Sequence, residues 1–323
     1  LSMENSTQVH MFLLLGFPGL ADFHVLFSIA FLLTYILTVW ENVVVMALIK
    51  TNCELYKPMY FFLGHLSFIE VWYTSVTIPK LFVNFIAEDR TISFEGCMTQ
   101  LFFFSSFICT ECVLLSAMAY DRCVAICHPL RYPVIMTHQM CIYLAAVSWF
   151  SGFTVSLIKI SFISQLKFCD PCVINHFFCD VSPVLKLACA DVSLAEMVDF
   201  VLALFILLVP LFITIVSYLL IIMTILHIPN TQSKKKAFST CSSHLTVVTI
   251  FFSTTLFMYA RPKKIESFDL NKLVSAVYTI VTPILNPFIY GLRNQEMKRA
   301  LKKALCEKMG ISKVWRSMPS LQM

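Results

Sequence analysis

Three acidic residues stand inside long apolar stretches of this sequence: Glu41, Glu70 and Glu111. Ionised carboxylates are costly at membrane depth, so an acid in such a stretch usually marks a functional site. Glu70 and Glu111 fall at matching depth in the second and third stretches, and two carboxylates this close cannot both stay ionised without a cation or a proton. We therefore expect a bound Na⁺ or a shared proton at this pair. The alternative is one glutamic acid that is simply protonated and hydrogen-bonded, while Glu41 is expected to pair locally.

An adjacent acid and base, Asp121 and Arg122, end the third apolar stretch. An arginine at membrane depth is costly unless it is paired, and the neighbouring carboxylate can pair with it. From these residues alone, the pair can also be two interfacial side chains that reach the headgroup level and have no switching role.

Cysteines are concentrated in one segment between the fourth and fifth apolar stretches, at Cys169, Cys172, Cys179 and Cys189, and Cys97 begins the third stretch. In an oxidising compartment such cysteines form disulfides. Five cysteines leave one unpaired, so the spacing alone leaves the pairing open. The Cys169-x-x-Cys172 pair is also compatible with a metal knuckle, but no second pair completes four ligands, and we expect no metal there.

The composition excludes most soluble and catalytic functions. Hydrophobic residues make up 58% of the 323 residues, charged residues make up only 13%, and the mean hydropathy is +0.78. A soluble domain carries about 25% charged residues, so most of this chain must lie in a bilayer. The sequence has no nucleophile–base pair, HExxH motif or phosphate-binding loop, so we expect neither an enzyme nor a cofactor. Nucleic acid is not an expected partner.

Seven stretches are long and apolar enough to cross a bilayer, which needs roughly 20 such residues per helix. We therefore predict an all-α membrane protein, a bundle of seven transmembrane helices. The predicted spans are 23–49, 59–82, 97–122, 140–162, 196–226, 237–259 and 270–292. The predicted organisation is an extracellular N-terminus (1–22), a seven-helix domain (23–292) and a cytoplasmic amphipathic helix with a tail (293–323).

Positive charge predicts the orientation, because Lys and Arg gather on the cytoplasmic side. With the N-terminus outside, 15 of the 24 fall inside: Lys50, Lys57, Arg122, Arg131, Lys234, Lys235, Lys236, Arg293, Lys298, Arg299, Lys302, Lys303, Lys308, Lys313 and Arg316. Asn5-Ser6-Thr7 is a glycosylation acceptor that is usable only in the lumen. Residues 1–20 contain no Lys or Arg and no cleavage signature, so the first span is expected to insert as an uncleaved anchor.

The segment after the seventh span, 294–308, predicts a short amphipathic helix on the membrane surface. Its apolar face is expected to comprise Met297, Ala300, Leu301, Ala304 and Leu305. The lysine run 234–236 and the basic segment 298–303 are either simple anchors or binding groups for anionic lipid and for an acidic surface of a cytoplasmic partner. Cys306 is a candidate for palmitoylation.

Four sequence blocks, in order along the chain, resemble the odorant receptor family of rhodopsin-like G-protein-coupled receptors. They are Pro-Met-Tyr-Phe-Phe-Leu at 58–63, Met-Ala-Tyr-Asp-Arg-Cys-Val-Ala-Ile-Cys at 118–127, Lys-Ala-Phe-Ser-Thr-Cys-Ser-Ser-His-Leu at 236–245 and Pro-Ile-Leu-Asn-Pro-Phe-Ile-Tyr at 283–290. Tyr-Ala-Arg-Pro at 259–262 resembles the class II, tetrapod-type branch. The chain departs from the family pattern at Cys123, where a tyrosine is usual, and at 251–253, where Phe-Phe-Ser replaces Phe-Tyr-Gly. The second change puts in doubt any ligand-sensing role carried over to that position.

The resemblance implies a function, partners and a location. The expected function is to bind a small, neutral, mostly apolar volatile and to activate a stimulatory, olfactory-type G protein that raises cAMP. The expected location is the plasma membrane, in the cilia of olfactory sensory neurons, in contact with membrane lipid. The resemblance also implies disulfides from Cys97 to Cys179 and from Cys169 to Cys189.

The resemblance assigns switching roles to residues at the inner half of the bundle. Asp121 and Arg122 resemble a latch that releases the arginine when the protein changes state, and Asn286 with Pro287 resembles a hinge in the seventh span, where proline kinks the helix. Tyr218 and Tyr290 are expected to meet through water once the inner cavity opens. Lys236 is expected to belong to the G-protein-coupling surface.

The resemblance places the odorant pocket in the outer half of the bundle. Helical spacing alone fits packing equally well, so this assignment depends on the family. The expected lining is Phe104, Ser105, Ile108, Cys109, Cys112, Leu202, Ile206, Phe252, Thr255, Leu256, Tyr259, Ala276 and Thr279. None of these side chains is charged, and Phe104 stands where amine receptors carry an aspartate.

Two other functions compete with this one. A rhodopsin-like receptor for a non-odorant metabolite or lipid would share every feature above, and a ligand screen would separate the two. A seven-helix transporter or channel is disfavoured, because the sequence shows no inverted repeats and no paired spans interrupted by Pro or Gly in corresponding halves.

Overall fold

The computed structural model describes residues 11–16, 24–86, 90–169, 172–259, 272, 274–276, 279, 282–293 and 295–308. Within these ranges the side chains of residues 24, 85, 233, 235–237, 239–240, 259, 291–293, 295 and 305–308 are not described. Asn5, proposed for glycosylation, and Arg261 therefore lie outside the described residues.

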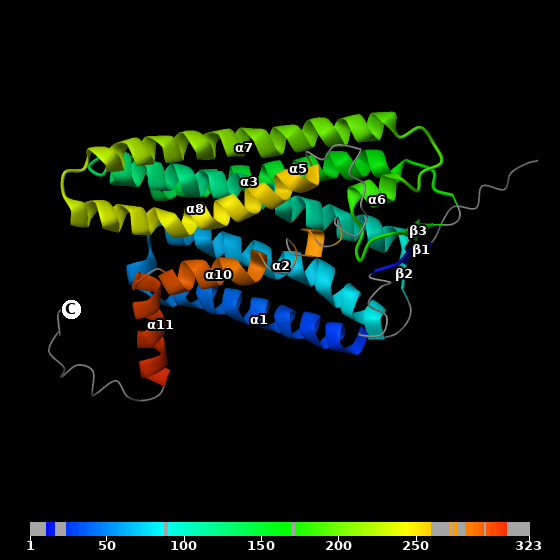
Figure 1. Ribbon diagram of the computed structural model, residues 1–323, viewed down its shortest axis with the longest axis horizontal. Coiled ribbons are helices and arrows are strands. Elements are labelled where there is room, and N and C mark those ends of the chain that lie inside the picture. The colour runs from blue at the N-terminus through cyan, green and yellow to red at the C-terminus, as the bar shows by residue number, and fades with distance from the viewer. Residues whose placement is uncertain are drawn as a thin grey trace, which may run out of the picture.

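Long helices lie side by side along the long axis of the molecule (Figure 1). They are α1 (His24–Thr51), α2 (Pro58–Ile86), α3 (Phe94–Cys127), α5 (His138–Ser164), α7 (Ser193–His227), α8 (Thr231–Tyr259) and α10 (Thr282–Arg293). Continuous apolar sequence favours helices in a bilayer, because a helix satisfies every backbone N–H and C=O within itself. The first six predicted spans each lie within one of these helices, apart from residue 23, and the seventh extends into residues that the structure does not describe.

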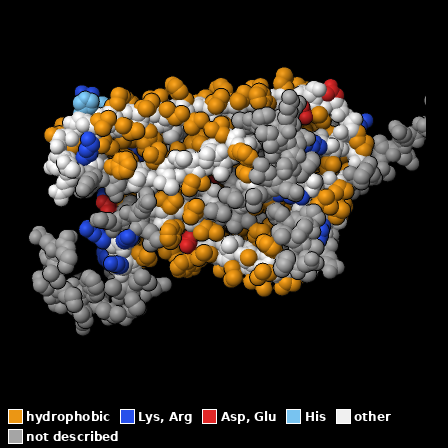
Figure 2. Space-filling model, in the orientation of Figure 1, with side chains coloured by type: hydrophobic (Ala, Val, Ile, Leu, Met, Phe, Trp, Pro, Cys, Tyr) orange, Lys and Arg blue, Asp and Glu red, His pale blue; other side chains and the backbone are white. Residues whose placement is uncertain are grey.

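Five of these helices are long and apolar enough to span a membrane: α1 from Val25, α3, α5, α7, and Cys241–Met258 of α8. Helix α2 is not one of these five, and it carries polar side chains such as His65, Glu70 and Lys80. Helix α10 is described over only 12 residues. Hydrophobic side chains cover the flank of the molecule, and the visible Lys and Arg side chains lie toward its two ends (Figure 2).

Helix α3 is the central element, buried along most of its length and packed against α2, α5, α7 and α8. Helix α5 crosses it closely at Gly152. A Cβ atom there would lie 2.7 Å from the carbonyl oxygen of Ser106 and from the backbone N of Thr110, and it would clash with the Thr110 hydroxyl. Only glycine permits this approach of the two helices.

A small sheet, which the sequence analysis did not predict, covers the outer end of the bundle. Strand β1 (Met11–Leu14) lies between β2 (Thr91–Ser93), to which it is antiparallel, and β3 (Val173–Ile174), to which it is parallel. Side chains alternate along β1, so that Phe12 and Leu14 are buried while Met11 and Leu13 are exposed. The buried pair packs in one apolar cluster with Cys97 and Cys179.

Two disulfides fix the outer segments, and they join the same pairs that the resemblance implies. Cys97 is bonded to Cys179 with their Cα atoms 5.5 Å apart, and Cys169 is bonded to Cys189 with a Cα separation of 5.9 Å. Cys172 is not in a disulfide, and its thiol lies 3.1 Å from the carbonyl oxygen of Cys169. The first bond ties α3 to the segment that precedes the short helix α6 (Val181–Leu185).

Helix α11 (Gln295–Lys308) runs across the end of the bundle opposite the sheet (Figure 1). Met297 and Ala300 are buried on the bundle side, whereas Leu301 of the predicted apolar face is 38% exposed. Glu296 anchors the helix, because its carboxylate accepts hydrogen bonds from Lys57 Nζ at 2.6 and 2.7 Å and from the Tyr60 hydroxyl at 2.9 Å. Helix α11 is therefore held directly to the inner end of α2.

Candidate functional site

Asp121 and Arg122 form an ion pair at the inner end of α3. Arg122 donates from Nε at 2.9 Å and from its terminal guanidinium nitrogen at 2.5 Å, both to Asp121 Oδ2. The other carboxylate oxygen, Oδ1, accepts a hydrogen bond from the Tyr132 hydroxyl, with the two oxygens 2.7 Å apart. The Asp121 side chain is fully buried and that of Arg122 is 13% exposed. A charged pair that is buried with satisfied hydrogen bonds is stable until a partner moves, which is what a latch requires.

Tyr132 was not among the predicted switch residues. It begins α4 (Tyr132–Ile135), a one-turn helix in the connection between α3 and α5. On one continuous helix, residues 11 apart share a face but lie about 16 Å apart along the axis, so the spacing alone does not bring Tyr132 to Asp121. Only the chain reversal after Cys127 brings this hydroxyl to the carboxylate.

His244 of α8 contacts the two tyrosines that were expected to meet through water. The Tyr218 hydroxyl lies 2.6 Å from His244 Nδ1, and the ring centroids of His244 and Tyr290 are 6.5 Å apart. All three side chains are buried. Among the described residues neither His244 Nε2 nor the Tyr290 hydroxyl has a hydrogen-bond partner. The structure thus links α7, α8 and α10 through a histidine that the sequence motif contained but that we had not singled out.

The intramembrane acids lie in a polar cluster at the middle of the bundle. Asn286 Nδ2 donates to Glu70 Oε1 at 2.5 Å, and both side chains are buried. Glu111 is buried as well, and both Glu111 and Glu41 lie within electrostatic range of Glu70. We expected Glu41 to pair with a nearby group, but its Oε2 atom has no hydrogen-bond partner among the described residues.

Several oxygens of this cluster have no hydrogen-bond partner in the described part of the chain: Glu70 Oε2, Glu111 Oε1 and Asn42 Oδ1. Buried oxygens of this kind suit a hard cation or a proton. The described residues hold no group of three or more His, Cys, Asp and Glu side chains that fits a metal ion. A cation here would therefore depend on two carboxylates together with amide oxygens.

The α3 face predicted to line the odorant pocket is buried in the outer half of the bundle. Phe104, Ser105, Ile108, Cys109 and Cys112 are all buried. The Cys112 thiol lies 3.1 Å from the carbonyl oxygen of Ile206 on α7.

The predicted lining residues on other elements differ in burial. Phe252, Thr255 and Thr279 are buried, while Leu202, Ile206, Leu256 and Ala276 are half-buried. Tyr259 is the last residue of α8, and its side chain is outside the described set, as is that of Lys236 on the inner side.

Two aromatic side chains cover this face and were missing from the predicted lining. Tyr73 of α2 stacks on Phe104 with ring centroids 5.1 Å apart, and Phe178 lies 4.5 Å from Phe104. The Tyr73 hydroxyl also donates to the Thr279 hydroxyl at 3.4 Å. Phe178 directly precedes the disulfide-bonded Cys179, so the disulfide places this ring over α3.

A buried ion pair between α5 and α7 was also missing from the predictions. Lys159 Nζ lies 2.8 Å from Asp199 Oδ1, and the two side chains are 2% and 19% exposed. Both charges act on Cys109, a residue of the predicted pocket face. A lysine inside an apolar span is itself a signal of a functional site, and Lys159 could have been found in this way.

Two titratable groups of the outer segment have shifted pKa values. Burial raises the pKa of Asp180 to about 6, although the hydrogen bond from the Val181 backbone N–H opposes the shift. Burial and then the charge of Lys272 lower the pKa of His176 to about 3. The outer half of the bundle is therefore more polar than the predicted lining suggested.

Comparisons with known proteins agree with these observations. The olfactory receptor family model matches residues 31–308. Human Olfactory receptor 6B1 is 58% identical over 308 residues, which are 95% of this chain and 98% of that relative. Human Olfactory receptor 6Y1 is 54% identical over 305 residues, 94% of each chain. Rat Olfactory receptor 226 is 53% identical over 306 residues, again 94% of each chain.

Proposed function

The chain belongs to the olfactory receptor family of seven-helix membrane receptors, and on that basis we propose that it binds a small, neutral, mostly apolar volatile and activates a stimulatory, olfactory-type G protein. Activation raises cAMP. The receptor is not an enzyme, and it is an integral membrane protein that crosses the bilayer several times. We place it in the plasma membrane of olfactory cilia.

One feature of α3 supports this proposal more than any other. The outer half of the helix carries the buried face from Phe104 to Cys112, and its inner end carries the Asp121–Arg122 pair. A ligand that shifts α3 or the helices packed on it can therefore act on the ion pair through one rigid element.

The proposed odorant site is the outer face of α3 with the facing residues of α7 and α8 and with Ala276 and Thr279, which precede α10. Its lining is mostly Phe, Leu, Ile and Cys, so burial of apolar surface supplies most of the affinity, about 25 cal/mol per Å². Ser105, Thr255, Thr279 and Tyr259 offer hydroxyls that orient one polar group of the ligand. A hydroxyl contributes about 0.5–1.5 kcal/mol, enough to orient the ligand but too little to set its affinity.

The Lys159–Asp199 pair adds a stronger polar group at the edge of this face. A ligand oxygen that accepts a hydrogen bond from the Lys159 ammonium would gain more than from a hydroxyl, because bonds to charged donors are stronger. We therefore propose aldehydes, ketones, esters and alcohols of about ten heavy atoms as the ligand class, active at micromolar concentration.

Inside the bundle, the Glu70–Glu111 pair would hold a proton or Na⁺, and Asn286-Pro287 would act as the hinge. His244 Nε2 and the Tyr290 hydroxyl have no hydrogen-bond partner among the described residues. Each can take a new partner when the helices move, which supports a rearrangement of α8 and α10. The inner ends of α7, α8 and α11 would then form the surface for the G protein, with Lys236 on it.

A cAMP reporter in cells that display the receptor at the surface tests the proposal against a panel of volatiles. The expected result is micromolar activation by neutral oxygenated volatiles. Ser105→Ala and Tyr259→Phe should each weaken the response to these ligands while surface expression is unchanged. Activation only by permanently charged compounds, or unshifted dose–response curves for both variants, would contradict the ligand assignment.

The ion pair needs its own control, since removal of one buried charge leaves the other uncompensated. Lys159→Gln alone should reduce surface expression, because breaking a buried pair costs about 3–5 kcal/mol. The double variant Lys159→Gln with Asp199→Asn should restore expression but respond less to carbonyl compounds. Equal responses of the double variant and the wild type would show that Lys159 does not contact the ligand.

A further inference from the structure

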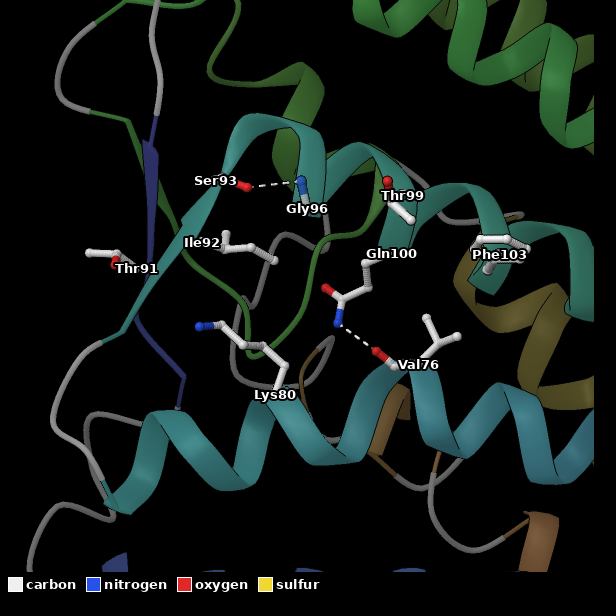
Figure 3. Close-up of a pocket in the computed structure, with 9 residues that line it drawn as sticks. All are labelled: Val76, Lys80, Thr91, Ile92, Ser93, Gly96, Thr99, Gln100 and Phe103. Carbon is white, nitrogen blue, oxygen red and sulfur yellow. Dashed lines mark hydrogen bonds between the residues drawn. The ribbon is translucent and has the colours of Figure 1, made fainter.

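A crevice of about 460 Å³ opens at the outer ends of α2 and α3 (Figure 3). Three elements line it: α2, strand β2 and the first turns of α3. The lining residues are Val76, Lys80, Thr91, Ile92, Ser93, Gly96, Thr99, Gln100 and Phe103. None of them belongs to the proposed odorant site, so the crevice is a separate cavity.

The lining changes from polar to apolar along the bundle axis. Helix α2 runs outward and α3 runs inward, so Lys80 lies one turn closer to water than Val76, and Thr99 one turn closer than Phe103. One turn is about 5.4 Å. The polar end therefore contains an ammonium and hydroxyl groups, and the membrane end contains Val76 and the 37%-exposed ring of Phe103.

The deep wall of the crevice is closed by satisfied groups. Gln100 Nε2 donates to the Val76 carbonyl oxygen at 2.9 Å, and Gln100 Oε1 accepts from the Cys179 backbone N–H at 2.9 Å. Ser93 Oγ accepts from the Gly96 backbone N–H at 3.0 Å. Below this level the stacked rings of Tyr73 and Phe104 fill the space between the helices. A molecule in the crevice is thus separated from the bundle interior.

Lys80 is the charged group of the crevice. Its half-buried side chain extends from α2 toward β2 (Figure 3). Within the described ranges no carboxylate forms an ion pair with it. A lysine at this depth can hold its stem on apolar surface and its ammonium at the level of the lipid headgroups.

We propose that this crevice binds a glycerophospholipid of the outer leaflet, with its phosphate on Lys80 and an acyl chain along Val76 and Phe103. The order of the lining matches that of the ligand: a compact cation for the anionic phosphate, then apolar surface for the chain. The site depends on the outward orientation of this end of the bundle, but it does not depend on which odorant the receptor binds.

Native mass spectrometry of the full-length receptor, purified in detergent, tests the site. The probe is phosphatidylcholine with palmitoyl and oleoyl chains, and the comparison ligands are the diacylglycerol with the same chains and free oleate. Phosphatidylcholine should remain bound to the wild type. Lys80→Gln should weaken its binding about tenfold, the effect of losing one charge-assisted hydrogen bond.

Lys167→Gln is the matched control, because Lys167 is an exposed lysine of the outer segment that does not line the crevice. It should bind phosphatidylcholine as the wild type does. Thr99→Trp is a second test, since Thr99 is exposed and an indole there would fill the crevice without entering the core. Thr99→Trp should abolish phosphatidylcholine binding. If Lys80→Gln does not give folded protein, Thr99→Trp alone tests whether the lipid lies in the crevice.

Three results would overturn the proposal. Equal retention of the diacylglycerol would mean that the phosphate is not recognised. Preferential retention of oleate would assign the crevice to fatty acids. Wild-type retention of phosphatidylcholine by Thr99→Trp would place the lipid elsewhere on the receptor.

Discussion

The Asp121 carboxylate accepts hydrogen bonds from two side chains that belong to different elements. One oxygen holds the Arg122 guanidinium, which is its neighbour on α3, and the other holds the Tyr132 hydroxyl from the inner connection. This arrangement fixes the rotamer of Arg122 against its own helix. We propose that the guanidinium becomes available to an acidic or carbonyl partner on the G protein when the inner ends of the helices separate.

The first prediction therefore concerns this pair. Arg122→Ala should abolish the cAMP response, because it removes the group that would face the partner. Surface trafficking should stay mostly intact, because Arg122 is itself partly exposed at the end of α3, so that water can replace it beside Asp121, which also keeps the hydrogen bond from Tyr132. Asp121→Asn should raise basal cAMP, since it removes the negative partner of Arg122. A normal agonist response of Arg122→Ala at matched surface level would rule out the latch.

The second prediction concerns pH and two outer residues with opposite effects. Asp180 has a pKa of about 6 in the folded protein, above its ordinary value, so the folded state binds the extra proton. Its contribution to stability is present at low pH and is lost as pH rises from about 4 to about 6. His176 has a pKa of about 3, below its ordinary value, so its contribution is lost as pH falls from about 6.5.

In the wild type, the effects of Asp180 and His176 on the change of stability with pH oppose each other. Single variants separate the two effects. Relative to the wild type, the Tm of Asp180→Asn should rise more steeply between pH 4 and 6, because His176 then acts alone. The Tm of His176→Gln should fall over the same range. Asparagine can still accept the Val181 hydrogen bond, so the cap of α6 is retained. Parallel pH profiles for all three proteins would contradict the assigned causes.

At the crossing of α3 and α5, no side chain can be added at Gly152 unless the two helices shift. The absence of a side chain at Gly152 lets α5 approach the backbone of α3 at Ser106 and Thr110. This contact fixes the distance between the helix that carries the proposed odorant face and the helix that carries Lys159.

Gly152→Val should therefore lower the stability of the receptor and its surface expression. Forcing extra atoms into a packed contact typically costs about 1–3 kcal/mol. Here two of the three nearest atoms belong to the α3 backbone and cannot rotate away. Gly64→Ala is the matched control, because a Cβ there would meet only the end of Ile49 at 3.9 Å. For both variants, surface expression is measured by flow cytometry and Tm with a thiol-reactive dye. Equal values for Gly152→Val and the control would show that α5 can shift freely.

The disulfide between Cys97 and Cys179 joins α3 to the outer segment that places Phe178 over Phe104. Loss of a native disulfide typically costs about 2–5 kcal/mol. We expect Cys97→Ser to be retained in the endoplasmic reticulum, with an endoglycosidase-sensitive glycan as the readout. Cys172→Ser should reach the surface, because a serine hydroxyl can replace the thiol against the Cys169 carbonyl oxygen. Normal trafficking of Cys97→Ser would sink this prediction.

The molecule as a whole has two ends of different chemistry. One end carries the three-stranded sheet and both disulfides, and the other carries α11 with its contacts to Lys57 and Tyr60. Disulfides belong to an oxidising compartment, and an amphipathic helix with a basic face belongs at the surface of the inner leaflet. The two ends therefore agree with the orientation that the distribution of Lys and Arg predicts.

This orientation gives the last prediction. An epitope fused to the N-terminus should be accessible on intact cells, whereas one at the C-terminus should require permeabilisation. Asn5→Gln should remove an N-linked glycan and increase mobility on a gel, as does treatment with a glycosidase. Labelling of the C-terminal epitope on intact cells would contradict the predicted topology.

The sequence alone determined the architecture, because the bilayer allows few solutions. Stretches of about 20 apolar residues must become helices, so the predicted spans lie within helices such as α3 and α7 that extend past the predicted ends. The family motifs also pointed to the Asp121–Arg122 pair and to the disulfide pairing, which the structure contains. The latch role of that pair and the hinge at Asn286-Pro287 stay predictions. These features depend on local composition and on short blocks of residues, which remain readable without a structure.

Only the tertiary structure decided which distant groups meet. Tyr132 reaches Asp121 through a chain reversal, His244 contacts Tyr218 and Tyr290 through helix packing, and Lys159 pairs with Asp199 across two helices. Strand β1 joins two outer segments that are about 80 and 160 residues away in the chain, as the pairs Phe12–Ile92 and Leu13–Val173 show. Helical periodicity indicates which residues share a face of one helix, but the rotation and separation of neighbouring helices depend on packing. That packing is set by contacts such as the one at Gly152, between residues far apart in the sequence.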